Sequence, residues 1–296
     1  MTGFICIDKP ENMTSFTAAN LVKRITGSKK AGHTGTLDPM ATGVLTVALS
    51  GATRFIELIP DHEKSYTARI LLGVTTDTLD ITGTVTGSFP VSVTPCDAKE
   101  AALSFYGEQL QTPPMYSAVS KDGVRLYDLA RQGKEIEREK RKINITEIRA
   151  YDFSDNEFSL DVTCSAGTYI RSLADDIGKK LGCGAVLKSL RRTKANGFST
   201  DDCITIEKLR EICENGELGN YVMPVSRVLS QYKEVHVTAA QAVRFKNGGE
   251  LFLDRIGNPK GDGFFRVFSP ENEFLGIGEK NVETGCLAVK RVLQGE

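Results

Sequence analysis

The sequence has little of what builds metal sites or disulfide frameworks. Its seven cysteines are scattered through 296 residues without a C-x-x-C pair, and none of its three histidines lies within five residues of another histidine or a cysteine. A scattered, odd set of cysteines indicates reduced thiols. Zinc ligands are usually closely spaced, so no metal site is predicted. Asp77 and Asp80 could share a metal, but in the turn TDTLDITG aspartates more commonly accept hydrogen bonds from their own backbone.

Long apolar segments and nucleotide-binding loops are missing as well. No apolar run approaches the roughly 18 residues that a membrane-spanning helix needs. The N-terminus, MTGFICIDKP, has no basic stretch ahead of an apolar segment, so we expect a cytoplasmic protein without a secretion signal. The chain lacks both the G-x-x-x-x-G-K-[ST] phosphate loop and the G-x-G-x-x-G dinucleotide fingerprint. No cofactor is therefore predicted.

Positive charge is concentrated in two stretches that contain no acidic residue. The net charge is −1, but residues 12–37 carry four lysines and arginines, and residues 179–194 carry six. Residues 197–217 carry six acids against two bases. Binding of a charged partner depends on the local field and not on the sum of charges. The pattern indicates a polyanionic partner, although solvated helix faces would give the same pattern.

The composition and the spacing of apolar residues predict a mixed α+β fold. Hydrophobic residues make up 40% and charged residues 25% of the chain, which is typical of a globular protein with a sizeable core. The spacing predicts strands over 3–8, 44–50, 65–74, 142–152 and 157–164, and helices over 16–26, 95–106, 124–132 and 167–182. Strict βαβ alternation is absent, so we expect a largely antiparallel mixed sheet with flanking helices.

The sequence changes in character after Pro224. Short strands dominate from about residue 233, and GFFRVFSPENEFLGIG has two apolar arms around a polar loop, as in a β-hairpin. We therefore predict two domains: a larger one over residues 1–230 and a compact β-rich one over residues 233–296.

Two polar segments are candidates for a catalytic site. Residues 32–43, GHTGTLDPMATG, form a glycine-flanked loop that can hold Asp38 in a special backbone geometry. A plain turn capped by Asp38 would have the same sequence. In GTYIR, Arg171 lies about 100° around a helix from Ile170. A surface ion pair with Asp175, four residues on, is the alternative role for this arginine.

The loop GHTGTLDPMATGVL resembles the central motif of the TruB family of tRNA pseudouridine synthases. Four more segments follow the order of that family: IDKPENMTSF, KSYTARILLGVTTDTLDITG, PPMYSAVSKDGVRLYDLARQG and GTYIRSLADDIGKKLGCGAVLKSLRRT. Together they cover about residues 4–195, and the later β-rich part resembles the family's PUA-type RNA-binding domain. Asn12 stands where the family usually has glycine, but asparagine tolerates left-handed geometry, so the turn can survive.

The resemblance implies an isomerase that converts uridine to pseudouridine in the T-loop of tRNA, at nucleotide 55, without cofactor or metal. By this resemblance Asp38 is the catalytic carboxylate. Attack on C6 of the base, attack on the anomeric carbon and a glycal-forming path all remain open. A carboxylate in a dry site needs a nearby cation to stay ionised, and Arg171 matches the family's active-site arginine.

The resemblance also assigns residues that bind the substrate. Tyr66 matches the tyrosine that stacks on the target base and assists removal of the C5 proton. Tyr169 and Leu190 match positions that line the uracil pocket, and His33 matches the histidine that holds the flipped nucleotides. Because the target uridine is stacked in a folded loop, it must be flipped out, and RNA contacts must offset that cost. The candidate phosphate contacts are Lys29, Lys30, Lys188, Arg191 and Arg192, to which Arg125, Arg131 and residues 138–142 add more charge.

The expected partner is tRNA, bound through its T-arm and, by the C-terminal domain, at its acceptor stem. No membrane and no obligatory protein partner is expected, and the chain is predicted to be a monomer. A catalytically silent RNA-binding or tRNA-folding protein on the same scaffold is one alternative, which the intact set of Asp38, Tyr66 and Arg171 disfavours. A nucleoside glycosidase that uses the same carboxylate is another.

Overall fold

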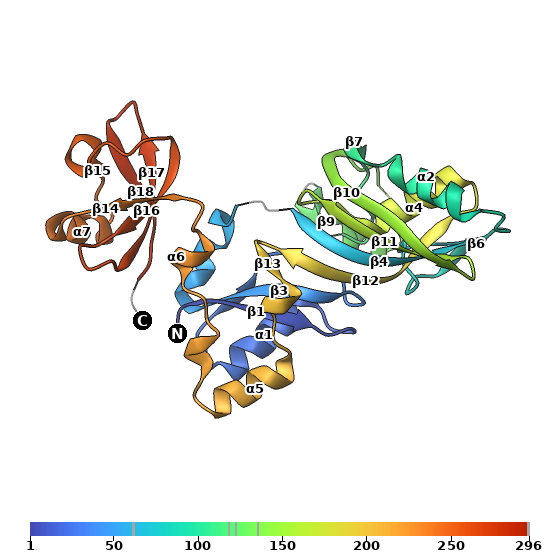
Figure 1. The fold of residues 1–296 in the computed structure, drawn as a ribbon, viewed down its shortest axis with the longest axis horizontal. Helices are drawn as coiled ribbons and strands as arrows, with labels where there is room; N and C mark the ends of the chain where they lie inside the picture. The colour runs from blue at the N-terminus through green and yellow to red at the C-terminus, as the bar shows by residue number, and fades with distance from the viewer. Residues whose placement is uncertain (61–62, 118, 122, 135, 295–296) are drawn as a thin grey trace.

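The structure is a computed structural model that describes residues 1–60, 63–117, 119–121, 123–134 and 136–294. Within this part of the chain, a nine-stranded sheet forms the larger body and a five-stranded sheet forms a separate lobe near the C-terminus (Figure 1). None of the described helices has the length and apolar character that crossing a bilayer needs.

The large sheet has the strand order β1-β3-β12-β4-β11-β10-β7. In addition, β2 pairs with β3 and β13 pairs with β12. Its strands are β1 (Gly3–Lys9), β2 (Ala31–His33), β3 (Thr42–Leu49), β4 (Lys64–Leu72), β7 (Gly107–Gln111), β10 (Arg141–Ser154), β11 (Glu157–Cys164), β12 (Ala185–Ala195) and β13 (Phe198–Ser199). All neighbours pair antiparallel except β3 and β12, which run parallel. The prediction of a largely antiparallel mixed sheet is confirmed.

Helices cover the two halves of this sheet. Buried residues of β4, β10 and β11 pack against α2 (Pro95–Leu103) and α4 (Ile170–Leu181). At the other end, β1 and β3 pack against α1 (Ser15–Ile25) and α5 (Ile206–Glu214). Along β4, alternate side chains are buried, as expected for a strand with one face toward helices. The remaining elements of this body are η1 (Ser50–Leu58), β5 (Val74–Thr76), β6 (Val85–Ser88), β8 (Ser120–Lys121), β9 (Val124–Arg125), α3 (Leu126–Arg131), η2 (Thr200–Asp202), η3 (Leu218–Asn220) and α6 (Val225–Val228).

Local sequence explains where the main helices begin and end. In α2, Thr94 and Asp97 form a capping box, and Pro95 occupies the first helical position. The left-handed Gly182 ends α4. Asn12 takes a φ of 61°, so asparagine adopts the left-handed conformation at the position where a glycine was expected.

The C-terminal lobe contains the strands in the order β14-β16-β17-β18-β15. Its elements are β14 (Lys233–His236), α7 (Ala239–Lys246), β15 (Leu251–Phe252), η4 (Leu253–Ile256), β16 (Gly263–Phe268), β17 (Phe274–Asn281) and β18 (Cys286–Val292). The hairpin over β16 and β17 was predicted, whereas α7 was not. The lobe shares a buried apolar cluster with the large body, in which the rings of Phe55 and Phe274 lie 6.0 Å apart.

Candidate active site

Asp38 lies in the loop between β2 and β3, and the loop is fixed at several points. The side chain of Leu37 is buried, and its backbone exchanges two hydrogen bonds with the Ser15 hydroxyl at 2.7 and 3.0 Å. The carbonyl of Asp38 accepts a bond from the Ala41 amide, which closes a turn. These contacts fix the backbone while 32% of the Asp38 side chain stays exposed, so the carboxylate can be reached from solvent.

Arg171 meets Asp38 in a two-point ion pair. Its Nε lies 2.8 Å from one carboxylate oxygen, and its Nη2 donates to the other at 3.1 Å. The same guanidinium donates to the carbonyls of Thr78 and Tyr116, at 3.1 and 2.9 Å. The alternative partner, Asp175, pairs with Lys179 instead. The structure therefore brings together the two residues that the sequence places 133 positions apart.

Asp80 is a second carboxylate at this arginine, and this contact was not predicted from the sequence. One oxygen accepts hydrogen bonds from the Thr82 amide and the Thr78 hydroxyl, as expected for an aspartate in this turn. The other oxygen lies 3.8 Å from Nη1 of Arg171, and only 4% of the residue is exposed. Arg171 therefore lies between two carboxylates, of which only Asp38 is accessible.

Lys9 also approaches the loop, which no sequence feature indicated. Its ammonium is fully buried and donates to the carbonyls of Pro10, Met13 and Pro39. Burial lowers the pKa of Lys9 to about 8, although the charge of Asp38 acts in the opposite direction. The bond to Pro39 fixes the residue directly after Asp38.

Tyr66 and Leu190 lie on the same face of the sheet. Tyr66 is on β4 with 8% exposed, and Leu190 is on β12 with 7% exposed, opposite Ala68. Tyr66 and Leu190 are therefore diagonal neighbours across the two strands. Burial raises the pKa of the Tyr66 phenol, and the adjacent Arg192 guanidinium acts against this effect.

Tyr169 and His33 are placed by their backbones. The amide and carbonyl of Tyr169 bond to the side chain of Gln111 at 2.8 and 3.0 Å, directly before α4 begins. His33 ends β2, and its Nδ1 has no hydrogen-bond partner in the described part of the chain. Burial, with the charge of Arg192, lowers the pKa of His33 and so favours the neutral imidazole.

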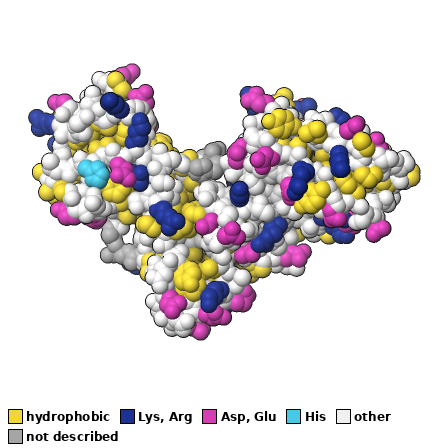
Figure 2. Space-filling view, in the orientation of Figure 1, with side chains coloured by type: hydrophobic (Ala, Val, Ile, Leu, Met, Phe, Trp, Pro, Cys, Tyr) yellow, Lys and Arg dark blue, Asp and Glu magenta, His cyan; other side chains and the backbone are white. Residues whose placement is uncertain are grey.

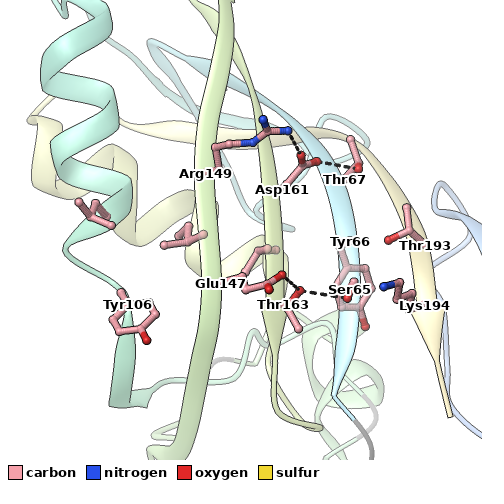
Figure 3. A pocket seen from close by; sticks show the side chains of 13 residues that line it. Ser65, Tyr66, Thr67, Tyr106, Glu147, Arg149, Asp161, Thr163, Thr193 and Lys194 are labelled. Atoms are coloured by element: carbon pink, nitrogen blue, oxygen red, sulfur yellow. Dashed lines mark hydrogen bonds and ion pairs between the residues drawn. The ribbon is translucent and has the colours of Figure 1, made fainter. Parts of the chain in front are cut away.

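A cavity of about 670 Å³ lies on the sheet but is not lined by Asp38 (Figure 3). Two hydrogen-bond chains cross it from strand to strand. Ser65, Thr163 and Glu147 form one, and Thr67, Asp161 and Arg149 form the other. The two carboxylates in these chains, Glu147 and Asp161, both accept hydrogen bonds from side chains of neighbouring strands.

Three family models match consecutive parts of this chain. The model described as TruB family pseudouridylate synthase, N-terminal domain, matches residues 23–170. A tRNA pseudouridylate synthase B C-terminal domain matches residues 171–230. A further model, pseudouridine synthase II TruB, C-terminal, matches residues 234–293. The chain belongs to the TruB family.

Relatives of this TruB-family chain match it over nearly its full length. The tRNA pseudouridine synthase B of Clostridium tetani is 42% identical over 288 residues, which cover 96% of this chain and 97% of that protein. The same enzyme of an Azoarcus species is 42% identical over 291 residues, covering 98% and 94%. A chain in the crystal structure of a Cbf5-Nop10-Gar1 complex superimposes with a TM-score of 0.75 at 25% identity, covering 99% of this chain and 85% of its own. The chain is thus a tRNA pseudouridine synthase, an isomerase, with the family's fold.

The basic residues expected to bind RNA in this TruB-family enzyme differ in their accessibility. Lys29 and Lys30 are exposed. Lys188 and Arg191 are 44% and 41% exposed, and they pair with Glu157 and Asp8. The prediction for Arg192 is wrong, because this residue is 2% exposed and its guanidinium donates to backbone carbonyls. The side chains of Arg125 and Arg131 lie outside the described residues.

The charged side chains on the molecular surface are mixed in sign. On the face drawn in Figure 2, Lys and Arg side chains are interspersed with Asp and Glu and do not form one continuous tract. An RNA contact on that face would therefore depend on individual cations.

Proposed function

We propose that this enzyme isomerises the uridine at position 55 in the T-loop of tRNA, with Asp38 as the nucleophile. The observation that carries the proposal is the two-point pair between Asp38 and Arg171, which supplies an accessible carboxylate with a cation fixed beside it. Such a pair places a fixed positive charge beside the carboxylate that would face the bound base.

In the proposed reaction the N1–C1′ glycosidic bond breaks, the uracil turns, and C5 bonds to the same sugar carbon. N1 gains a proton and C5 loses one, so the overall change is an isomerisation. Asp38 attacks either C6 or C1′, or stabilises a glycal-forming path. Tyr66 stacks on the base and assists removal of the C5 proton, for which its buried position on the same side of the sheet as Leu190 is suitable.

The base reaches this site by flipping out of the T-loop. Flipping costs a few kcal/mol of lost stacking, and we propose that His33, Tyr169 and Leu190 hold the flipped nucleotides. A neutral imidazole can both donate and accept a hydrogen bond, which suits contact with uncharged base edges. Exposed cations such as Lys29, Lys30, Lys188 and Arg191 would contact phosphates.

The same proposal gives a role to each of the two predicted domains. Residues 1–230 would act as the catalytic domain and residues 233–296 as a PUA-like domain at the acceptor stem. We propose that the enzyme works as a cytoplasmic monomer without a cofactor.

The test uses a T-arm hairpin RNA whose target uridine carries tritium at C5. Asp38→Asn should abolish tritium release while the dissociation constant for RNA changes only a few-fold. Asp161→Asn is the matched control, because Asp161 also pairs with an arginine, Arg149, at 2.7 Å but lies on β11 in the polar chains of Figure 3. Turnover by Asp38→Asn would refute the catalytic assignment.

The same assay separates the alternative functions. Release of free uracil by the unmodified enzyme would indicate a glycosidase. Binding of the hairpin with neither tritium release nor uracil release would indicate a silent RNA-binding protein. Tritium release from a second hairpin, in which the target uridine is replaced by cytidine and the remaining uridines carry the tritium at C5, would contradict position 55 as the site.

A further inference from the structure

Arg192 is a buried arginine whose guanidinium faces backbone carbonyls and no carboxylate within bonding distance in the described residues. Its Nε donates to the carbonyl of Val44 at 2.8 Å, and its two terminal nitrogens donate to Thr36 and Gly35 at 3.3 and 3.1 Å. Gly35 and Thr36 precede Asp38, whereas Val44 follows the loop at the start of β3. One side chain therefore joins both ends of the loop that carries Asp38.

The backbone of Arg192 also lies between this loop and Tyr66. On β12, Arg192 is paired with Gly43 of β3 on one side and with Tyr66 of β4 on the other. The charge of its guanidinium also acts on the Tyr66 phenol, whose pKa it lowers against the effect of burial. The approach to β3 is close, because a Cβ at Gly43 would lie 2.2 Å from the Arg192 carbonyl oxygen. These contacts fix the relative position of the two strands at this point.

We propose that Arg192 is a positioning residue that holds Asp38 and Tyr66 in a single arrangement toward the target base. The inference rests on the proposed function, in which both residues act on that base. Arginine suits the role because its planar fork presents five N–H donors to separated acceptors. Lysine would keep the charge but would donate from one nitrogen only, so it could not reach all of these acceptors.

The expected effect is on rate and not on RNA affinity. A displacement of a catalytic group by about 1 Å can cost about 10²-fold in rate. Since Arg192 is buried and bonded to the protein itself, its replacement should leave the phosphate contacts in place. A decrease in activity that came only from reduced stability would instead follow the fraction of folded enzyme.

The experiment compares Arg192→Lys and Arg192→Gln with the control Arg69→Gln. Arg69 is also a largely buried arginine of the same sheet, with a side chain 20% exposed. It is three residues from Tyr66 on β4 and so points to the opposite face, where it pairs with Asp152 and Glu157. Each variant is assayed by tritium release under single-turnover conditions, by filter binding of the hairpin, and by thermal unfolding.

We expect both Arg192 variants to lose about 10²-fold in the saturated rate with an affinity within a few-fold of the wild type. Arg69→Gln should lower the melting temperature and keep the rate. Should Arg192→Gln fail to fold, Arg192→Lys, which retains the charge and the aliphatic stem, carries the test. The positioning role is overturned if folded Arg192→Lys reacts at the wild-type rate, or if the decrease appears only as weaker binding.

The outcome for Asp38→Asn keeps this inference separate from the proposed function. If Asp38→Asn is inactive while folded Arg192 variants are fully active, only the positioning role fails. If Asp38→Asn is active, the catalytic assignment itself fails.

Discussion

Replacing Arg171 by lysine tests the contacts of the candidate active site at constant charge. The guanidinium has four acceptors within 3.1 Å: both oxygens of Asp38 and the carbonyls of Thr78 and Tyr116. A lysine ammonium has three donors on a single nitrogen. At least one of the four bonds must therefore break, and the second carboxylate, Asp80, keeps only a more distant cation.

The expected loss in the free energy of unfolding follows from these bonds. A hydrogen bond to a charged group contributes about 1.5–3 kcal/mol. Because 32% of the Asp38 side chain is exposed, we expect the lower end of this range for Arg171→Lys. Removing the cation altogether, as in Arg171→Met, should cost about 3–5 kcal/mol, since it leaves buried charge unpaired. Either change releases Asp38 from its fixed position and should reduce the saturated rate by about 10²-fold or more.

Urea denaturation and single-turnover tritium release measure the two effects. Arg149→Lys is the control, because the Arg149 side chain is 71% exposed and its pair with Asp161 should contribute no more than about 1 kcal/mol. If Arg171→Lys matched this control in both stability and rate, the reasoning about the site would be refuted.

Three further predictions concern the surroundings of the site. The pKa of Lys9 is lowered from 10.5 to about 8, so between these pH values the unfolded chain binds more protons than the folded protein. The free energy of unfolding of the wild type, relative to that of Lys9→Met, should therefore rise with pH across this window when both are measured by urea denaturation. A difference that does not change with pH would contradict this. Gly43→Ala should lower the melting temperature measured by calorimetry, because at a φ of 101° its new methyl group would meet the carbonyl of Arg192; an unchanged value would show that β3 and β12 can separate freely. Replacing Lys188 and Arg191 by alanine should weaken tRNA binding and reduce the slope of log affinity against log salt by about one for each phosphate that these side chains neutralise; an unchanged slope would remove both from the RNA interface.

Strands and helices with a regular apolar period could be predicted from the sequence, and β12 could not. From Leu190 to Thr193, inward and outward side chains alternate along β12, but the inward residue Arg192 is charged like its outward neighbour Arg191. The apolar alternation that identifies a half-buried strand is therefore broken. For the same reason, Arg192 was interpreted as part of an exposed basic tract. The eight-residue α7 was missed because its neighbours are all short strands.

The candidate site could be predicted in part. The motifs identified Asp38 and Arg171, but only the fold brings them within 2.8 Å of each other. The contacts of Asp80 with Arg171 and of Lys9 with Pro39 were not predicted, because they join distant segments and local spacing does not encode them. Turn chemistry explained one oxygen of Asp80, and nothing in that turn indicated an arginine more than 90 residues further on.

The apolar cluster shared by the two lobes affects how the C-terminal one can be studied. Cutting the chain near residue 230 would remove Phe268, Phe274 and Ile277 from their contact with Phe55 and Leu58 and would expose an apolar surface on the larger body. If such a truncated protein aggregated or lost activity, the result would reflect the exposed apolar surface. It would not test whether the C-terminal lobe binds the acceptor stem. Charge-changing substitutions on the outer surface of the C-terminal lobe, which leave the shared apolar cluster intact, would separate an effect on RNA binding from an effect on folding.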